Sequence, residues 1–475
     1  MILERFGYDR QGEIREVPTT LQKNALGAFD VSLAAMAFNA PAWITAASMS
    51  VLYSVIGSAA PLAILISFFF PMLVLALCLV YMTRAAPSAG GIFTFTSRFL
   101  HPLAGTVLGW TYTIACAAVT PMTALIATQY LQALLPGAHG QLAANLIGTA
   151  LLVLFTGVCL YGVALTARIA IVLLACELTV IVGLGLAGIV APHVATSTVS
   201  FFTPPAEWPV LGSGVLLGMW MLANFDSAIN YIEEARIPVR TVQRSLLAVL
   251  CSVLVVYMVA AIGWQRAVDV RVLAAISENG DGGPISAVAK VYLPPSLCWI
   301  AIAVVVTSAV AGLQVSMTAG ARTAYRMAQD GHLPRVFGLT NRYQAPWVSV
   351  VTIGCTATAF IWRKPLAEID FYYNAAVVTL AFAYFAALAA FCGLMFRRQS
   401  AIRALLASAL PCLAMGVLAY LMYSAGAAPA DPKDLYQAWY IGAGVLGSSL
   451  LIAVFGRSGA RAAGSRNAPQ LTHGH

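Results

Sequence analysis

The chain has 475 residues, of which 60% are hydrophobic and only 9% are charged, and its formal net charge is +8. About a quarter of the residues in a typical soluble domain are charged, so this composition excludes an ordinary soluble protein and indicates lipid as the main surroundings. The basic residues lie between apolar stretches and form no basic face. The sequence therefore predicts contact with the lipid bilayer and no binding to nucleic acid.

From residue 25 to 456 the chain alternates between long apolar stretches and short polar loops, which predicts one all-α transmembrane domain. Residues 1–24 are polar, lack a cleavable signal peptide and are expected to be a cytoplasmic segment. Residues 457–475 are expected to be a disordered cytoplasmic tail. About twelve stretches are long enough to cross a bilayer, near 26–52, 60–82, 103–134, 142–163, 168–191, 210–231, 243–264, 296–328, 346–362, 368–396, 403–424 and 437–456.

The loop charges support this count of twelve. With the N-terminus in the cytoplasm, 20 of the 26 Lys and Arg residues fall on the inside and six on the outside. This bias matches the positive-inside rule and places both termini in the cytoplasm. The composition, rich in Ala and Leu, favours a bacterial inner (plasma) membrane. The sequence leaves a monomer and a homodimer equally open.

The first predicted span is interrupted at Phe38-Asn39-Ala40-Pro41-Ala42-Trp43. Pro41 has no N–H and its ring crowds the preceding turn, while Asn39 can bond to the local backbone. Two interpretations stay open, a packed proline kink and an unwound segment that presents free backbone groups to a ligand.

The sixth predicted span is interrupted as well. It holds Asn224, Asp226 and Asn230 in an otherwise apolar run. Interrupted helices at matching positions in two halves of a chain indicate a transport site near the bilayer midplane. The two halves have no convincing sequence similarity, so the repeat is an inference from the positions of the breaks.

Ionisable residues inside spans are costly, and each is therefore a functional candidate. Glu177 lies in the middle of the fifth span and is a candidate to gain and lose a proton during transport. The alternative is a structural acid that stays neutral. Asp226 would either attract an ammonium group or hold the sixth span to a neighbour. Gating or structural ion pairs are expected near the cytoplasmic ends, where side chains can reach water, at Asp30, Glu233, Glu234, Arg322 and Arg326.

Motifs of other protein classes are missing. The nine cysteines all lie in apolar stretches without C-x-x-C spacing, so no metal site and no cofactor is predicted. Gly183, Gly185 and Gly188 match G-x-G-x-x-G, but they lie in an apolar helix and predict helix packing instead. The sequence has neither G-x-x-x-x-G-K-[ST] nor H-E-x-x-H, and we therefore expect no enzyme. A channel or a membrane-embedded enzyme is the competing class.

Three stretches resemble motifs of one transporter family. They are Pro87-Ser88-Ala89-Gly90-Gly91 with Gly109-Trp110, then Phe225-Asp226-Ser227 with Glu233 and Pro238, and then Ala321-Arg322 with Asp330-Gly331-His332-Leu333-Pro334. In this order they make residues from about 25 to 455 similar to the amino acid–polyamine–organocation (APC) permeases. The resemblance implies a LeuT-like five-plus-five inverted repeat, with repeats at about 25–191 and 210–396 and two extra helices at about 403–456.

The resemblance also implies a substrate site between the broken spans. In the family, glycine-flanked N–H groups of span 1 usually bind a substrate carboxylate, whereas this chain has no glycine there and one donor fewer. Trp220 falls where arginine/agmatine-type exchangers carry a gating aromatic residue, and Asp226 falls where they carry an acid. Glu177 falls where some proton-coupled members carry a lysine. The expected substrate contacts are Phe38, Asn39, Ala40, Pro41, Ala42, Trp43, Trp220, Ala223, Asn224 and Asp226.

Two functions follow from these implications. The first is a secondary active transporter of amino acids, coupled to protons at Glu177 and working by alternating access. The second is an amine or polyamine carrier, or an exchanger of amino acids and amines, which would use Asp226 and Glu177. The poor carboxylate site in span 1 favours the second. The first needs a substrate carboxylate to bind at the ends of broken span 1, where the helix dipole favours anions.

Overall fold

The structure is a computed structural model that describes residues 27–88, 90–135, 137, 140–161, 163–194, 201–204, 208–232, 235–276, 283–363, 369–427, 440 and 442–452. Over these residues every regular element is a helix. The predicted terminal segments 1–24 and 457–475 lie outside the described residues.

The α-helices follow one another with short connections. In chain order they are α1 (Ala28–Asn39), α2 (Pro41–Ile56), α3 (Ala60–Ser67), α4 (Leu73–Ala85), α5 (Gly91–Phe99), α6 (Pro102–Leu134), α7 (Gln141–Leu160), α8 (Val163–Val190), α9 (Trp208–Met221), α10 (Pro238–Ala267), α11 (Val270–Ala275), α12 (Gly283–Tyr292), α13 (Trp299–Gln329), α14 (Trp347–Arg363), α15 (Ile369–Arg398) and α16 (Ala401–Ala427). Short helical turns are η2 (Gly57–Ala59), η3 (Phe68–Met72), η5 (Phe225–Tyr231), η7 (Pro295–Leu297) and η8 (Arg335–Gly338).

Proline marks the start of several of these helices. Pro41, Pro102 and Pro238 are the first residues of α2, α6 and α10. A proline at this position costs no hydrogen bond, because the first N–H groups of a helix have no partner in the helix, and its fixed φ suits the helix. Pro41 therefore starts a new helix and does not kink an existing one.

Eight helical segments in the described part of the chain are long and apolar enough to cross a membrane, and the first of them, Ala28–Ala85, contains the first two predicted spans. Trp347–Arg363 and Gly442–Ile452 are shorter apolar helices. The protein is thus an all-helical, multi-span membrane protein. The twelve-span count and the inverted repeat stay predictions.

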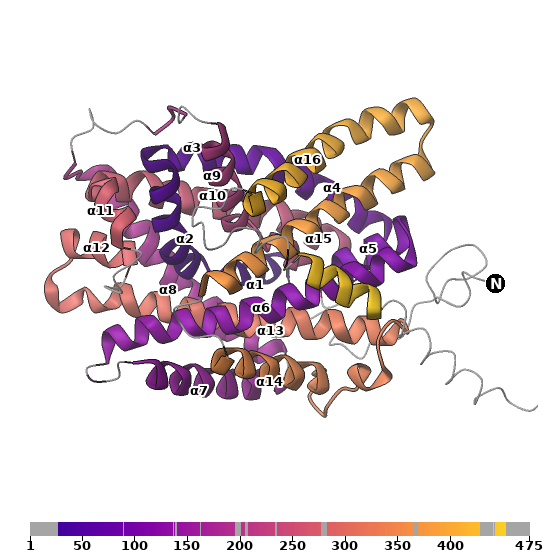
Figure 1. The fold of residues 1–475 in the computed structure, drawn as a ribbon, viewed down its shortest axis with the longest axis horizontal. Coiled ribbons are helices and arrows are strands. Elements are labelled where there is room, and N and C mark those ends of the chain that lie inside the picture. The colour runs from indigo at the N-terminus through magenta and orange to yellow at the C-terminus, as the bar shows by residue number, and fades with distance from the viewer. Residues whose placement is uncertain are drawn as a thin grey trace, which may run out of the picture.

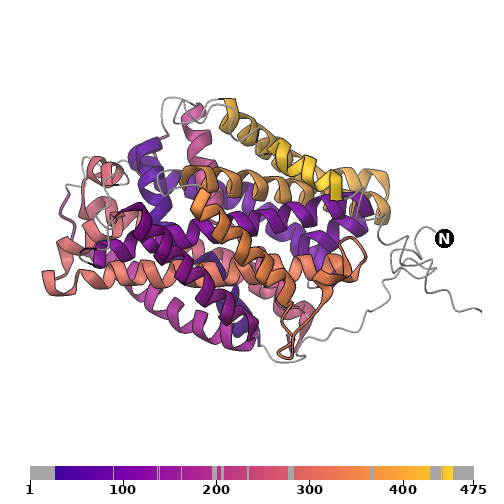
Figure 2. The ribbon, with the colours of Figure 1, turned by 60° about the horizontal axis from the view of Figure 1, so that its bottom comes forward.

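Helices α6 and α13 form the centre of the fold. They pack against each other more extensively than any other pair, and both lie along the longest dimension of the molecule (Figure 1). On one side α7 and α14 pack against them, and on the other lie α1, α2 and α15. The turned view in Figure 2 shows the same long helices stacked in layers. The first interrupted helix, α1 and α2, therefore lies beside α13, and the turn η5 (Phe225–Tyr231) of the second packs against α1.

The glycines of α8 act as packing residues. A Cβ atom on Gly188 would lie 2.0 Å from the carbonyl oxygen of Gly263 on α10, and one on Gly185 would lie 2.8 Å from that of Val259. These distances leave room for hydrogen only, so the backbones of α8 and α10 touch. The prediction of helix packing, rather than dinucleotide binding, is confirmed for Gly185 and Gly188, whereas a Cβ atom on Gly183 would meet nothing within 4 Å.

Candidate functional site

The first helix break lies between α1 and α2. α1 ends at Asn39, Ala40 has the left-handed dihedrals φ 47° and ψ 65°, and α2 starts at Pro41. A residue with a side chain rarely adopts positive φ, so Ala40 is a point of local strain. Gly312 of α13 provides the space for it, because a Cβ atom there would lie 3.2 Å from that of Ala40. The break is therefore one unwound residue between two helices and not a proline kink within one helix. The free backbone groups of the second interpretation are not found at Ala42 and Trp43, whose N–H groups have partners within the protein.

The second helix break lies at the end of α9. The helix stops at Met221, Asn224 adopts φ 67°, and the tighter turn η5 follows. Asparagine tolerates left-handed dihedrals better than other residues with side chains. The prediction that Asn224 replaces a glycine at this position is consistent with this conformation.

Asn39 joins the two breaks. Its side-chain Nδ2 donates hydrogen bonds to the carbonyl oxygens of Met221, at 2.9 Å, and Ala223, at 2.8 Å. Its Oδ1 accepts a hydrogen bond from the hydroxyl of Tyr257 on α10. Asn39 is fully buried, and both of its donors and its acceptor are used. The amide thus binds backbone groups that the second break leaves without helical partners.

Glu177 reaches from α8 to the first turn of α2. Its Oε2 accepts a hydrogen bond from the hydroxyl of Ser308 on α13, at 2.7 Å, and from the backbone N–H of Ala42, at 3.4 Å. The hydroxyl of Ser308 in turn accepts one from the N–H of Trp43, at 3.0 Å. A carboxylate at this place complements the positive end of the α2 dipole. Its other oxygen, Oε1, is buried and has no hydrogen-bond partner among the described residues.

Asp226 lies at the start of η5 and is 5% exposed. Its Oδ1 accepts a hydrogen bond at 2.8 Å from the hydroxyl of Tyr384 on α15, and that hydroxyl accepts one at 2.9 Å from the N–H of Asn224. Tyr112 and Cys116 of α6 also lie within the range of electrostatic interaction with Asp226.

The two buried carboxyl groups share one property. No contact within the described parts of the chain gives Glu177 or Asp226 a cationic partner. A buried carboxylate without a compensating charge is costly, so each group requires a proton or a bound cation. The predicted aromatic residues Trp43 and Trp220 are buried as well, at 3% and 2% exposed.

Two of the residues expected to form ion pairs at the cytoplasmic ends, Asp30 and Arg322, have hydrogen bonds to backbone groups. Asp30 accepts a hydrogen bond from the N–H of Gly27, at 2.8 Å, and so caps the start of α1. Arg322 donates to the carbonyl oxygen of Asn230, at 3.4 Å, and lies 5.6 Å from the ring centre of Tyr231. The predicted Glu233 and Glu234 lie outside the described residues.

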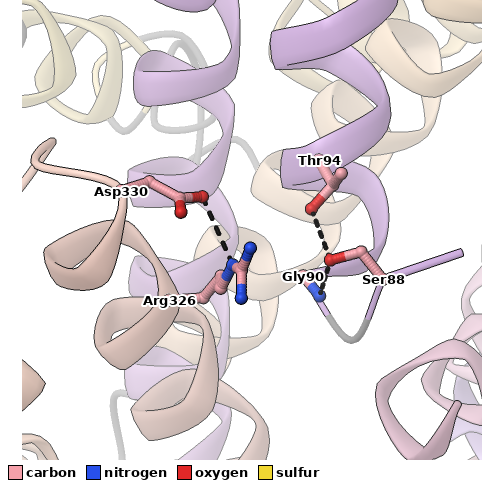
Figure 3. A network of polar contacts seen from close by, with 5 residues as sticks. All are labelled: Ser88, Gly90, Thr94, Arg326 and Asp330. Atoms are coloured by element: carbon pink, nitrogen blue, oxygen red, sulfur yellow. Dashed lines mark hydrogen bonds and ion pairs between the residues drawn. The ribbon is translucent and has the colours of Figure 1, made fainter. Parts of the chain in front are cut away.

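A further set of polar contacts lies at the end of α13 and in the loop before α5, and it includes Arg326, for which an ion pair was expected (Figure 3). Arg326 and Asp330 of the α13 end form an ion pair of 3.3 Å. Across from it, the hydroxyl of Ser88 lies 3.1 Å from that of Thr94 and accepts a hydrogen bond from the N–H of Gly90. A Cβ atom on Gly90 would lie 3.3 Å from the side chain of Arg326, so the loop before α5 lies against the end of α13.

Sequence reasoning also missed Ser308, Tyr257 and Tyr384, which complete the site. Each is a single hydroxyl in a long apolar helix, and nothing in the sequence distinguishes it from the other Ser, Thr and Tyr residues of these helices. Only packing shows that these three reach the breaks. Within the described residues no group of three His, Cys, Asp or Glu side chains lies together as a metal site would require.

These features define a multi-span helical membrane protein in which two interrupted helices meet at a buried polar centre. Residues 30–450 match the model of the amino acid permease family. The chain therefore belongs to this family, within the APC superfamily that the sequence motifs resemble.

Curated relatives agree with this assignment. The chain is 23% identical to an uncharacterized amino acid permease of Bacillus subtilis, over 57% of this chain and 61% of that protein. It is 26% identical to a probable amino-acid permease of Schizosaccharomyces pombe, over 28% of this chain and 27% of that protein. In both cases the chain spans less than two thirds of the relative's length.

Proposed function

We propose that this protein is a secondary active transporter that carries amino acids or closely related amines by alternating access. The observation that supports the proposal is the pair of helix breaks joined by Asn39, beside two buried carboxyl groups. Interrupted helices of this kind form midplane substrate sites in transporters, and buried intramembrane acids mark substrate or proton pathways.

The proposed substrate site lies between the two breaks. Asp226 would attract the substrate's ammonium group, and Trp220 would close over the substrate as a gate. The remaining proposed contacts are Phe38, Asn39, Ala40, Pro41, Ala42, Trp43, Ala223 and Asn224. In this proposal Asn39 holds the two breaks in register, because its amide is already bonded to the second break.

Glu177 is the proposed proton carrier. As a carboxylate it attracts the N-terminal end of α2 and accepts a hydrogen bond from the hydroxyl of Ser308 on α13. Glu177 therefore connects α8 with α2 and α13. A proton would neutralise it and weaken both contacts, which would allow α2 to move against α8 and α13. Tyr257 is the titratable neighbour that interacts electrostatically with Glu177.

The test of proton coupling is Glu177→Gln, a substitution that keeps the shape and removes the titration. In proteoliposomes loaded with unlabelled substrate, the variant is expected to keep exchange of labelled substrate. We expect uptake by the variant to lose its dependence on an inward proton gradient, whereas the native chain keeps it. If the proton gradient drives uptake equally in the native protein and in Glu177→Gln, Glu177 is not the proton carrier.

The proposed placement is a bacterial inner membrane, with twelve spans in two inverted repeats and both termini in the cytoplasm. On this placement the Arg326–Asp330 pair and the Arg322 contact with Asn230 lie at the cytoplasmic end of the site. The Arg322 contact joins α13 to η5, so it would close the inner side and break when the site opens inward, whereas the Arg326–Asp330 pair lies within the end of α13.

A further inference from the structure

The main-chain donors at the start of α2 are all in use. Pro41 has no N–H, the N–H of Ala42 donates to Glu177 and that of Trp43 donates to Ser308. Those of Ala40 and Ile44 donate to the carbonyl oxygens of Ala37 and Ala40. The N-terminal end of a helix is a natural site for an anionic group because the first N–H groups of the helix lack helical partners. Here the protein's own carboxylate takes that place, directly at Ala42 and through Ser308 at Trp43.

The second break is occupied in the same way. The carbonyl oxygens of Met221 and Ala223 accept the two N–H groups of Asn39. The N–H of Asn224 donates to the hydroxyl of Tyr384. Side chains of the protein thus satisfy the backbone groups with which a bound amino acid would otherwise pair at both ends.

Two buried side-chain atoms near the start of α2 have no hydrogen-bond partner among the described residues, the neutral donor Nε1 of Trp43 and the carboxyl oxygen Oε1 of Glu177, and only the second carries charge when ionised. Oε1 of Glu177 is fully buried and has no hydrogen-bond partner among the described residues. A carboxylate oxygen accepts hydrogen bonds and donates none when ionised, so it calls for a donor such as an ammonium group. A second carboxylate brought to the same helix end would face Glu177 with like charge in a region of low dielectric.

We propose that Glu177 takes the place of a substrate carboxylate, so that this protein carries small organic ammonium ions that lack an α-carboxylate. The ammonium group is held by Asp226, which has no cationic partner in the described part of the chain. Oε1 of Glu177 accepts a further donor where the substrate has one, as leucinamide and cadaverine do. This inference rests on the proposed transport function and names its substrate class.

The first experiment compares matched compounds in proteoliposomes that hold the native protein. Each amino acid of a panel is offered beside its amide, its decarboxylated amine and its N-acetyl derivative. Leucine, leucinamide, 3-methylbutylamine and N-acetylleucine form one such set, and lysine with cadaverine begins another. We expect kcat/KM at least tenfold higher for the amine and the amide than for the amino acid. The N-acetyl compound, which keeps the carboxylate and loses the ammonium, should not be carried.

Two substitutions at Glu177 separate two roles of this side chain, its hydrogen bonds at the start of α2 and its gain and loss of a proton. Glu177→Gln keeps an oxygen that accepts from Ser308 and Ala42, so it should still reject amino acids although its proton dependence is lost. Glu177→Ala frees the N–H of Ala42, so amino acids should gain at least tenfold in affinity relative to the amines. Binding is measured by competition in detergent, and a thermal transition like that of the native protein establishes that the variant is folded.

The outcomes separate this inference from the transport function. Uptake of amino acids with equal or higher kcat/KM than their amines by the native protein would overturn the inference and leave transport intact. Uptake of none of the compounds would overturn the transport function, and the inference with it. If Glu177→Ala does not fold, the comparison of compounds on the native protein still decides. A folded Glu177→Ala that rejects amino acids as the native protein does would overturn the role of Glu177.

Discussion

At the scale of single residues, the buried polar side chains at the two helix breaks differ in their hydrogen-bond partners. Asn39 and Glu177 have contacts with backbone groups of the two breaks, whereas Asp226 has one hydroxyl partner, Tyr384. A buried acid with so little compensation is costly, and such residues persist where function needs them. Asp226 is therefore the residue that we propose as the contact for a substrate's ammonium group.

This difference leads to a prediction for Asp226→Asn. The substitution keeps the size and the hydrogen bond with Tyr384 and removes the negative charge. We expect the affinity for a cationic substrate to fall at least tenfold, which corresponds to about 1.4 kcal/mol. Binding is measured by isothermal titration calorimetry in detergent, with thermal stability followed in parallel.

The matched control for this prediction is Tyr384→Phe, which removes the hydroxyl partner and leaves the charge in place. Its affinity should change less than that of Asp226→Asn. Unchanged affinity in Asp226→Asn, together with a lower thermal transition, would make Asp226 a structural acid that holds η5 to α15. That was the second interpretation of this residue from the sequence.

Residue types alone predicted the acids but not their partners. Glu177, Asp226 and the Asn-Ala-Pro break are conspicuous because polar residues and internal proline are rare in apolar spans. Ser308, Tyr257 and Tyr384 are not conspicuous, since hydroxyl groups in helices usually bond to the preceding turn. Their contacts depend on which faces of α10, α13 and α15 turn toward the breaks, and tertiary packing decides this.

At the scale of elements, helix contacts made by glycine determine how closely neighbouring helices pack. A Cβ atom on Gly188 of α8 would meet the carbonyl oxygen of Gly263 on α10, and one on Gly263 would meet that of Gly185, so neither Gly188 nor Gly263 has room for a side chain. Glu177 lies on the same α8, so this contact helps to hold its side chain at the start of α2. Close backbone packing between small residues is the usual means of helix association in membranes.

We therefore predict that Gly188→Ala destabilises the protein, because its new methyl group would meet the carbonyl oxygen of Gly263 at 2.0 Å. Overpacking of a well-packed contact costs about 1–3 kcal/mol. Gly183→Ala on the same helix is the control, since a Cβ atom there meets nothing within 4 Å. Thermal unfolding in one detergent should show a lower transition for Gly188→Ala only, and equal transitions would contradict the close packing.

Element boundaries were predicted well where the helix is a long apolar run and poorly where it is short. The stretch 103–134 corresponds to α6 (Pro102–Leu134), and 296–328 corresponds to α13 (Trp299–Gln329). Three short helices, α5, α11 and α12, were not predicted. They are too short for a span, and their sequences resemble loops because packing against neighbouring helices, rather than hydropathy, stabilises them.

At the scale of the whole molecule, the distribution of charge predicts which side of the membrane each loop faces. Arg271 of α11 is among the six basic residues assigned to the outside, and Arg335 of η8 is among the 20 assigned to the inside. Both side chains are exposed in the structure. If the positive-inside bias sets the topology, these two positions lie on opposite sides of the membrane.

Cysteine labelling of intact cells checks this prediction. The nine native cysteines are first replaced, and Arg271→Cys and Arg335→Cys are then introduced separately. A maleimide that does not cross the membrane should label position 271 in intact cells, and position 335 only after the cells are permeabilised. Labelling of both positions in intact cells would show that the number of spans between them is even. That result would contradict the twelve-span arrangement. It would also contradict the proposal that the two breaks occupy matching positions in the two halves of an inverted repeat.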